Sequence, residues 1–428
     1  MRDGWLVHSL GATLPGRATL EAEGLLATGD ESGFRGNMLL AVAQPSGFAA
    51  WLAKDVDEAV RRLPGAGFSA EVDLAAKRQR FSNLELMLGS AKFTGRVEAV
   101  QEGDARPSAT LALDGGALDL EGLSAFASIF VSSEGANRFA VQYLDLEIWA
   151  GPGNAWGLSS YRVDTALRYL DGVLEVDRLA LSGLAGASVS ATGRISNFPE
   201  SPAGRLDASL VAVDLAPLVD ALESQYGANA VVAGFARRVH AWPGLLEDAR
   251  IDAVMSVAAG DGSDGGFAIS AHGSAGGSAF SASLSGQRNG DDMLRAPLSA
   301  TLGIRNDDGT LMALAGLPAL PLGLAGPAVA DISARGNLSQ GMETHALLTG
   351  DDFRASFEGT VSSGDGAAVK GKASLDAADI EPWLMTAGVA LPGMGTGTSV
   401  SLAADADYEG GLLILNGLSG AVNESAVS

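Results

Sequence analysis

The 428-residue chain contains no cysteine, few aromatic residues and few basic ones. Without cysteine it can form no disulfide, no thiolate zinc site and no cysteine nucleophile. It carries 28 Lys and Arg against 51 Asp and Glu, a formal net charge of −23, and its basic residues nowhere cluster beyond pairs such as Arg61-Arg62. Because nucleic acid is bound through clustered positive charge, we expect no nucleic-acid partner.

Long apolar segments of the kind that form export signals and membrane spans are also scarce. The first residues lack a basic region followed by an apolar stretch. The stretch Ala313–Ala330 approaches the length of a spanning helix, but three prolines and three glycines interrupt it, and we interpret it as a loop. Because the sequence ends inside an alternating pattern, we expect a fragment of a longer protein, in which an anchor can lie outside this chain.

Glycine is abundant, with 57 residues in a chain that is 47% hydrophobic. Apolar and polar residues alternate with the period of a β-strand; Leu84, Leu86 and Leu88, for example, share one face. Dipeptides typical of hairpin turns separate such runs, namely Asp114-Gly115, Asp171-Gly172, Asn289-Gly290, Asp308-Gly309, Asp365-Gly366 and Asn416-Gly417. Short helices are predicted at Phe48–Leu63, Leu215–Tyr226 and Ile380–Ala387. The fold class is therefore mainly β: a curved antiparallel sheet with a few short helices.

Three segments repeat the same order of a glycine in an alternating strand and then an apolar helix. Their glycines, Gly24, Gly193 and Gly359, lie 169 and 166 residues apart. In the last two segments Asp-(Leu/Ile)-x-Pro precedes the helix, at Asp214–Pro217 and Asp379–Pro382, 165 residues apart. Strands rich in Gly, Ala and Ser can also resemble one another by composition alone, but here the whole order recurs. We infer internal repeats.

The repeats predict one elongated region over residues 1–428, with approximate units 1–165, 166–330 and an incomplete 331–428. Stacked strand units give a long curved sheet with one apolar face, which must be covered or filled. Two outcomes remain open. Either helices and a folded-over sheet fill the interior, or it is a taco-shaped groove, lined by Leu, Val, Ala and Phe, that accepts something apolar.

Six side chains represent these two outcomes. Leu86, Leu181, Val211 and Leu375 are candidate strand positions for lining such a groove, and each can equally fill a closed core. Trp51 and Trp383 occupy equivalent repeat positions beside apolar neighbours. We predict that both are structural anchors between helix and sheet rather than ligand contacts.

Motifs of catalysis and metal binding are missing. The four histidines, His8, His240, His272 and His345, lack a second histidine or carboxylate at metal-binding spacing and are predicted to be surface or turn residues. The acidic clusters Asp261–Asp264 and Asp405–Glu409 are interpreted as solvated hairpin turns rather than calcium loops. No nucleophile elbow, phosphate loop or dinucleotide motif occurs. We expect a protein that is not an enzyme and holds no cofactor or metal.

Two adjacent segments resemble the AsmA family. Tyr169–Ile195 reads Y-x-x-G-V-L-x-V-x-x-L-x-L-x-G-L-x-G-A-x-V-x-A-x-G-x-I, and Leu206–Leu218 reads L-x-A-x-L-x-A-x-D-L-x-P-L. The last repeat, Phe357–Leu384, is similar as well. The resemblance covers roughly residues 10–60, 80–120, 165–225 and 270–428, and its motifs are degenerate because strand alternation and glycine turns define them.

The resemblance implies an elongated, groove-forming β-sheet that projects into the periplasm from an N-terminal helix in the inner membrane. AsmA-like proteins are associated with outer-membrane biogenesis and are thought to carry phospholipids between the two membranes. This chain departs from the pattern because it lacks the anchor helix. The implied partners are phospholipid acyl chains and, through the missing anchor, the membrane. The alternative is a structural, adhesin-like β-repeat scaffold with a dry core, whereas a glycan-active enzyme is disfavoured by the scarcity of clustered acids and aromatics.

Overall fold

The computed structural model describes residues 4–28, 32–52, 54, 56, 58–100, 108–119, 122–123, 125–126, 129, 143–155, 158–198, 201–226, 230–258, 265–287, 297–307, 326–362, 368–386, 395–409 and 412–427. The chain divides into two units, Met1–Phe198 and Pro199–Ser428. Positions 165 and 330, which the repeat spacing suggested as limits, lie inside strands β12 (Arg162–Leu170) and β20 (Ala328–Asn337).

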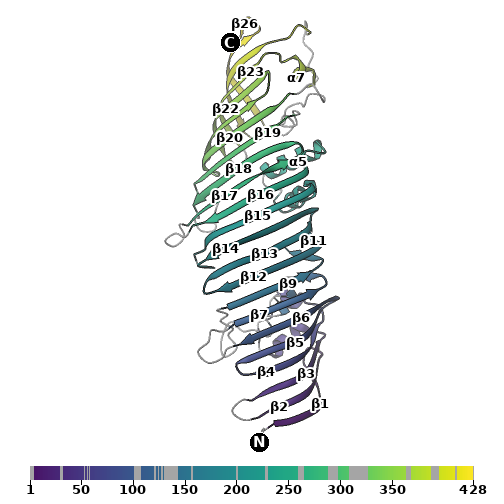
Figure 1. Cartoon of the computed structure of the whole chain (residues 1–428). Helices are drawn as coiled ribbons and strands as arrows, with labels where there is room; N and C mark the ends of the chain where they lie inside the picture. The colour runs from purple at the N-terminus through teal and green to yellow at the C-terminus, as the bar shows by residue number, and fades with distance from the viewer. Residues whose placement is uncertain are drawn as a thin grey trace. The chain divides into compact units, whose positions relative to one another are not determined.

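The first unit is built on a sheet whose strands pair in the order in which they follow along the chain (Figure 1). These strands are β1 (Gly4–Leu14), β2 (Ala18–Ala27), β3 (Gly33–Val42), β4 (Ala66–Ala75), β5 (Arg78–Leu88), β6 (Ala91–Val100), β7 (Ser108–Gly115), β9 (Tyr143–Ala150), β12, β13 (Val173–Leu184) and β14 (Ala187–Ser196). All of these pairs are antiparallel except β7 with β9, which is parallel. A small second sheet joins β8 (Leu118–Asp119), β10 (Gly153–Ala155) and β11 (Leu158–Ser160). Helices α1 (Pro45–Trp51) and α2 (Glu58–Arg62) follow β3.

The second unit is an antiparallel meander. Its strands are β15 (Ala203–Asp214), β16 (Glu247–Val257), β17 (Gly266–Ala275), β18 (Ser278–Gln287), β19 (Leu298–Asn306), β20, β21 (Gly341–Thr349), β22 (Phe353–Ser362), β23 (Ala368–Ala377), β24 (Val400–Glu409), β25 (Leu412–Val422) and β26 (Ser425–Val427). Helices α4 (Ala216–Tyr226) and α5 (Ala230–Ala241) separate β15 from β16, and α7 (Glu381–Thr386) follows β23. The predicted fold class is confirmed, since each unit is mainly β with a curved sheet and few short helices (Figure 1).

The predicted repeat order is visible in the elements themselves. Gly24, Gly193 and Gly359 lie in β2, β14 and β22, and each of these strands is followed by a second strand and then a short helix. In the last two segments aspartate begins the helix: Asp214 Oδ1 accepts the N–H of Ala216 at 2.8 Å, and Asp379 Oδ1 accepts that of Glu381 at 3.0 Å. Proline follows in the first turn, where its missing N–H breaks no helical bond.

One helix prediction needs correction, and one helix was missed. The stretch Phe48–Leu63 is not one helix but the two short helices α1 and α2. Helix α5 was not predicted at all. Its apolar residues Val232, Ala236 and Val239 follow helical spacing, but the segment lies outside the repeat pattern on which the other helix predictions depended.

The turn predictions have mixed outcomes. Asp171-Gly172 joins β12 to β13 with φ of 50° and 78°, as a type I′ turn requires. The prediction is wrong for Asp114-Gly115, which lies in β7. A Cβ at Gly115 would lie 2.3 Å from the carbonyl oxygen of Lys92, so glycine here allows the neighbouring strand to approach closely. It is also wrong for Asn416-Gly417, where Gly417 (φ 59°) lies in β25 opposite a register shift, as in a bulge. The other three dipeptides include residues outside those described.

One cluster of acidic residues is also placed differently. Asp405–Glu409 was interpreted as a solvated turn, but these residues lie in β24, where Asp405 faces Lys372 of the neighbouring strand. Alternating charged and apolar residues here mark a strand with one polar face. Asp261–Asp264 lies outside the described residues.

The core of the first unit lies between the sheet and its short helices. Phe93 (β6), Val72 (β4) and Val60 (α2) are each 1% exposed, and Phe48 of α1 is 4% exposed. Burial of large side chains on a single face of the sheet holds the helices against it.

Replacing Phe93 by alanine is expected to lower the free energy of unfolding by about 3–5 kcal/mol, because the buried ring leaves a cavity. Met87→Ala, on the opposite face of neighbouring β5 and 40% exposed, is the control and should cost about 0.5 kcal/mol or less. Chemical denaturation followed by circular dichroism measures both. Equal losses would contradict the assignment of the core to one face.

Candidate functional site

One face of the first unit's sheet is apolar from strand to strand. The register aligns one such row, in which each residue is the direct partner of the next: Leu20, Leu40, Phe68, Leu86, Phe93, Gly115, Ala150, Val163, Leu181 and Val189. Two of the predicted lipid contacts, Leu86 and Leu181, belong to this row. Leu86 is 6% exposed and lies in the core, whereas Leu181 is half-buried at its margin.

The second unit has the same one-sided character across eleven strands, β15 to β25. One row comprises Leu206, Met255, Ile269, Leu284, Ala300, Ala334, Thr344, Gly359, Gly371, Ala406 and Leu415. Its one polar side chain is Thr344, whose Oγ1 donates to the carbonyl oxygen of Met342 at 3.0 Å. A parallel row contains the predicted contact Leu375 between Ala355 and Leu402. We call this surface the apolar face of the second unit.

The helices cover only part of the apolar face. Near α7 a small cluster is buried, with Ala328, Ala330, Phe353 and Ala377 at its centre and Leu375 packed against it. Away from this cluster, the row from Leu206 to Leu284 is half-buried. Ile332, on the same face, is 37% exposed, and Leu415 is 53% exposed. Apolar side chains therefore reach the surface over a continuous part of the sheet.

Val211 does not belong to the apolar face, and its prediction as a lining residue is wrong. It is the cross-strand partner of Arg250, while its neighbours Leu210 and Ala212 pair with Ile251 and Ala249. Val211 is 50% exposed on the polar face. The reason is the strand period of two: the alternating apolar residues of β15 are the even-numbered ones, and Val211 lies between them.

The two tryptophans have different environments although they occupy equivalent repeat positions. Trp383 (α7) packs on Phe353 of β22 with ring centroids 5.3 Å apart, so it links helix to sheet as expected. Trp51 is 49% exposed, and its ring contact is with Phe48 on its own helix, at 5.7 Å. Phe48, 4% exposed, fills the anchoring position in place of Trp51.

In the first unit, the face of the sheet opposite the apolar one is polar and carries ion pairs between strands. Arg168 contacts Asp177 through Nε at 2.6 Å and Glu175 at 3.1 Å, and Arg194 contacts the same Glu175 at 3.2 Å. The hydrogen bond from Arg168 holds the pKa of Asp177 below its usual range and raises the pKa of Arg168. Exposed pairs of this kind contribute little stability singly, but they keep this face hydrated and in register.

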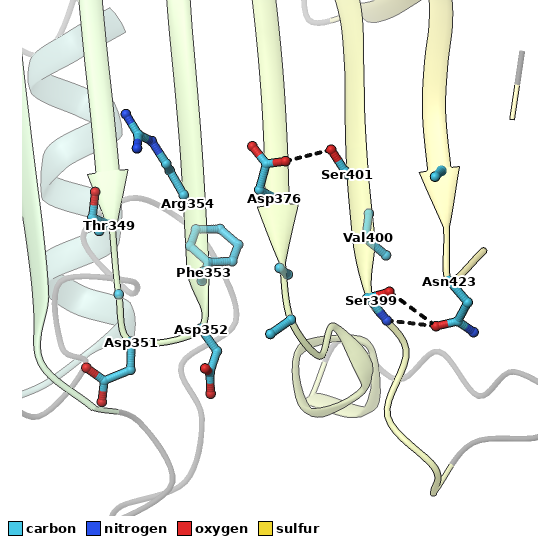
Figure 2. Close-up of a pocket in the computed structure, with 14 residues that line it drawn as sticks. Thr349, Asp351, Asp352, Phe353, Arg354, Asp376, Ser399, Val400, Ser401 and Asn423 are labelled. Atoms are coloured by element: carbon cyan, nitrogen blue, oxygen red, sulfur yellow. Dashed lines mark hydrogen bonds between the residues drawn. The ribbon is translucent and has the colours of Figure 1, made fainter. Parts of the chain in front are cut away.

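A shallow hollow of about 540 Å³ lies at the strand ends of the second unit (Figure 2). Arg354 and Asp376, which are cross-strand partners, lie at its upper side in the view, and Ser401 Oγ donates to Asp376 Oδ1 at 2.6 Å. The Ser399 N–H donates to Asn423 Oδ1 at 2.9 Å. Asp376, Ser399, Ser401 and Asn423 are engaged in these hydrogen bonds between neighbouring segments, so we assign no ligand to the hollow.

Comparison with known proteins gives no relative: no family model matches the chain, and no curated protein or solved structure matches it either. The AsmA resemblance therefore stays a prediction. Among the described residues, every helix is too short to cross a membrane.

The substitution Arg168→Gln is expected to raise the pKa of Asp177, because the hydrogen bond that favours the carboxylate is lost. A carboxyl whose folded pKa is depressed stabilises the fold above its unfolded pKa, and that contribution disappears as the pH falls through the folded pKa. Carboxyl-carbon NMR titration measures the change. Arg194→Gln, which removes a contact to Glu175 alone, is the control, and an equal pKa shift of Asp177 in both variants would contradict the assignment.

Proposed function

We propose that the chain is a non-enzymatic lipid-binding protein that holds phospholipid acyl chains against the apolar faces of its sheets. In the full-length protein, which we propose is anchored in the inner membrane, these faces conduct phospholipids through the periplasm and support outer-membrane biogenesis, in the manner of the AsmA family that the sequence resembles. Lipid headgroups stay at the polar margins of the sheet.

The observation that carries this proposal is the apolar row of the second unit, which crosses eleven strands with one polar side chain, Thr344. Strands are spaced about 4.8 Å apart, so a row crossing eleven strands extends for about 48 Å. Each buried CH₂ of a ligand is worth about 0.8 kcal/mol, so a chain lying along such a row gains affinity without directional contacts. Affinity for such a surface depends on the length of the acyl chain, so phospholipids with different headgroups can bind to it.

The competing function is a structural scaffold with a dry interior. The buried cluster near α7 favours a dry interior at one margin of the sheet, where the helix packs against the strands. The half-buried row from Leu206 to Leu284 favours lipid contact, because a sheet that serves only as a scaffold gains nothing from leaving large apolar side chains accessible.

A charge-matched pair of triple variants distinguishes the two functions. Met255, Ile269 and Leu284 are successive partners on the apolar face, whereas Val254, Ser270 and Ser283 are successive partners on the polar face of the same three strands. Aspartate at the first three positions is expected to reduce co-purifying phospholipid at least tenfold, because carboxylates cannot be buried against acyl chains. Aspartate at the second three should leave it unchanged. Native mass spectrometry and lipid extraction measure the content, and circular dichroism verifies the fold.

Equal lipid content in both folded variants would contradict the proposal and support the scaffold. The absence of phospholipid from the unmodified protein, expressed with membranes present, would do the same.

A further inference from the structure

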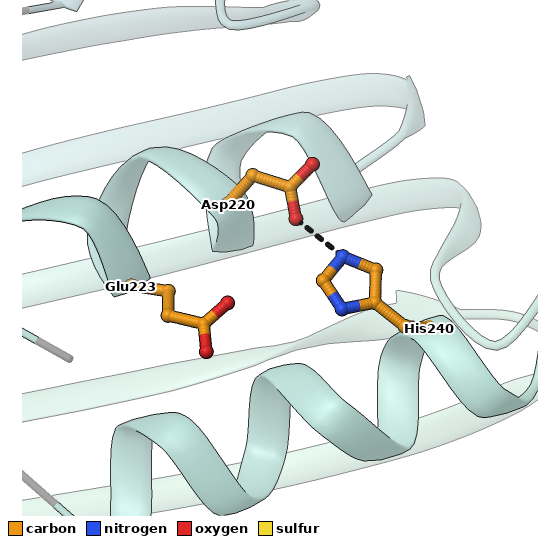
Figure 3. Close-up of side chains that lie close together, drawn as sticks. All are labelled: Asp220, Glu223 and His240. Atoms are coloured by element: carbon orange, nitrogen blue, oxygen red, sulfur yellow. Dashed lines mark hydrogen bonds and ion pairs between the residues drawn. The ribbon is translucent and has the colours of Figure 1, made fainter.

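Three potential metal ligands converge on the helical hairpin of the second unit (Figure 3). Asp220 and Glu223 lie one turn apart on α4, and His240 projects toward them from the last turn of α5. Nε2 of His240 lies 2.7 Å from Oδ1 of Asp220, and one donor atom from each residue lies within 4.8 Å of the other two. Twenty residues separate Asp220 from His240, so local sequence spacing did not reveal the cluster.

Buried neighbours fix the backbone beneath these side chains. Val219 precedes Asp220 and Val239 precedes His240, and both valines lie in an apolar cluster with Ala236 and Leu245. The exposed fractions are 8% for Val219 and 4% for Val239. Packing of the two helices therefore sets the separation between the ligand-bearing positions, with the side chains of Asp220 and His240 exposed and that of Glu223 half-buried.

The charges of the cluster favour a cation. Two carboxylates on one helix face, three residues apart, repel each other and disfavour the helix. A metal ion can replace the 2.7 Å hydrogen bond between Nε2 of His240 and Oδ1 of Asp220, because an imidazole that has given up that proton offers a nitrogen lone pair. A divalent ion placed between the three groups would accept all three donors and cancel the repulsion.

We propose that Asp220, Glu223 and His240 form a binding site for a divalent transition-metal ion, with Zn²⁺ as the best fit. Zinc takes imidazole nitrogen at about 2.0–2.1 Å and carboxylate oxygen at about 2.0–2.2 Å, which places the donors of a tetrahedral site roughly 3.3 Å apart. Rotation of the three side chains closes the remaining gap. The imidazole selects zinc over Ca²⁺ and Mg²⁺, which prefer oxygen alone, and three protein ligands leave one position for water.

Two other histidines of the same unit provide internal controls. His272 lies 4.0 Å from Asp252, and His345 lies 3.8 Å from Glu358. Both pairs are exposed on the polar face of the sheet, and each joins a histidine to one carboxylate. Each pair supplies an exposed imidazole and one carboxylate, as the proposed site does, but lacks a second carboxylate as third ligand.

Titration of the full chain with Zn²⁺, followed by isothermal calorimetry, tests the proposal. We expect one site per chain that Ca²⁺ and Mg²⁺ at equal concentration do not fill. His240→Ala and Glu223→Gln should each weaken Zn²⁺ binding at least tenfold, while His272→Ala and His345→Ala should change it less than twofold. Circular dichroism verifies that each variant is folded.

Three results would overturn the zinc site: no Zn²⁺ binding by the unmodified chain, unchanged affinity in Glu223→Gln, or an equal loss in the His272→Ala control. None of these outcomes bears on lipid binding, because the hairpin residues lie outside the strand rows of the apolar face.

Discussion

The structure depends on a single constraint: each strand must pair with the next in the register that places the apolar side chains of both on the same face of the sheet. A shift of one residue in any pairing would move a whole strand's apolar residues to the polar face. The sheets avoid this through continuous registers. Where a register shifts, as between Phe81 and Leu84 of β5, a bulge absorbs the one extra residue and the apolar side chains stay on one side. The hydrophobic effect thereby acts across many strands at once, although no single strand buries much surface.

Glycine and short helices follow from the same constraint. Gly24 faces Gly36 in the first unit, and Gly359 faces Gly371 in the second. A Cβ at Gly36 would lie 2.0 Å from the carbonyl oxygen of Glu23, so these positions keep neighbouring strands close on the apolar face. The short helices then cover one margin of that face and leave other rows half-buried. A sheet built in this way has an apolar side that its own chain covers only in part.

Much of this was predictable from the sequence. Period-two alternation identified the apolar side of β5 correctly, and the Asp-x-x-Pro elements located the starts of α4 and α7, because strand faces and helix caps are local properties. Val211 was misplaced although the period of two puts it between Leu210 and Ala212, and its pairing with Arg250 shows that it lies on the other face. The exposure of Trp51 and the approach of His240 to Asp220 depend on tertiary contacts. No local pattern encodes them.

The central claim is that acyl chains contact one face of the sheet and not the other. Site-specific photo-crosslinking tests it most directly, with the photoreactive residue placed at Ile269 or at the adjacent Ser270 in β17, in cells whose phospholipids are isotopically labelled. The account predicts labelled lipid on the protein from position 269 and none above background from position 270. Equal crosslinking from both positions, or none from either, would contradict it.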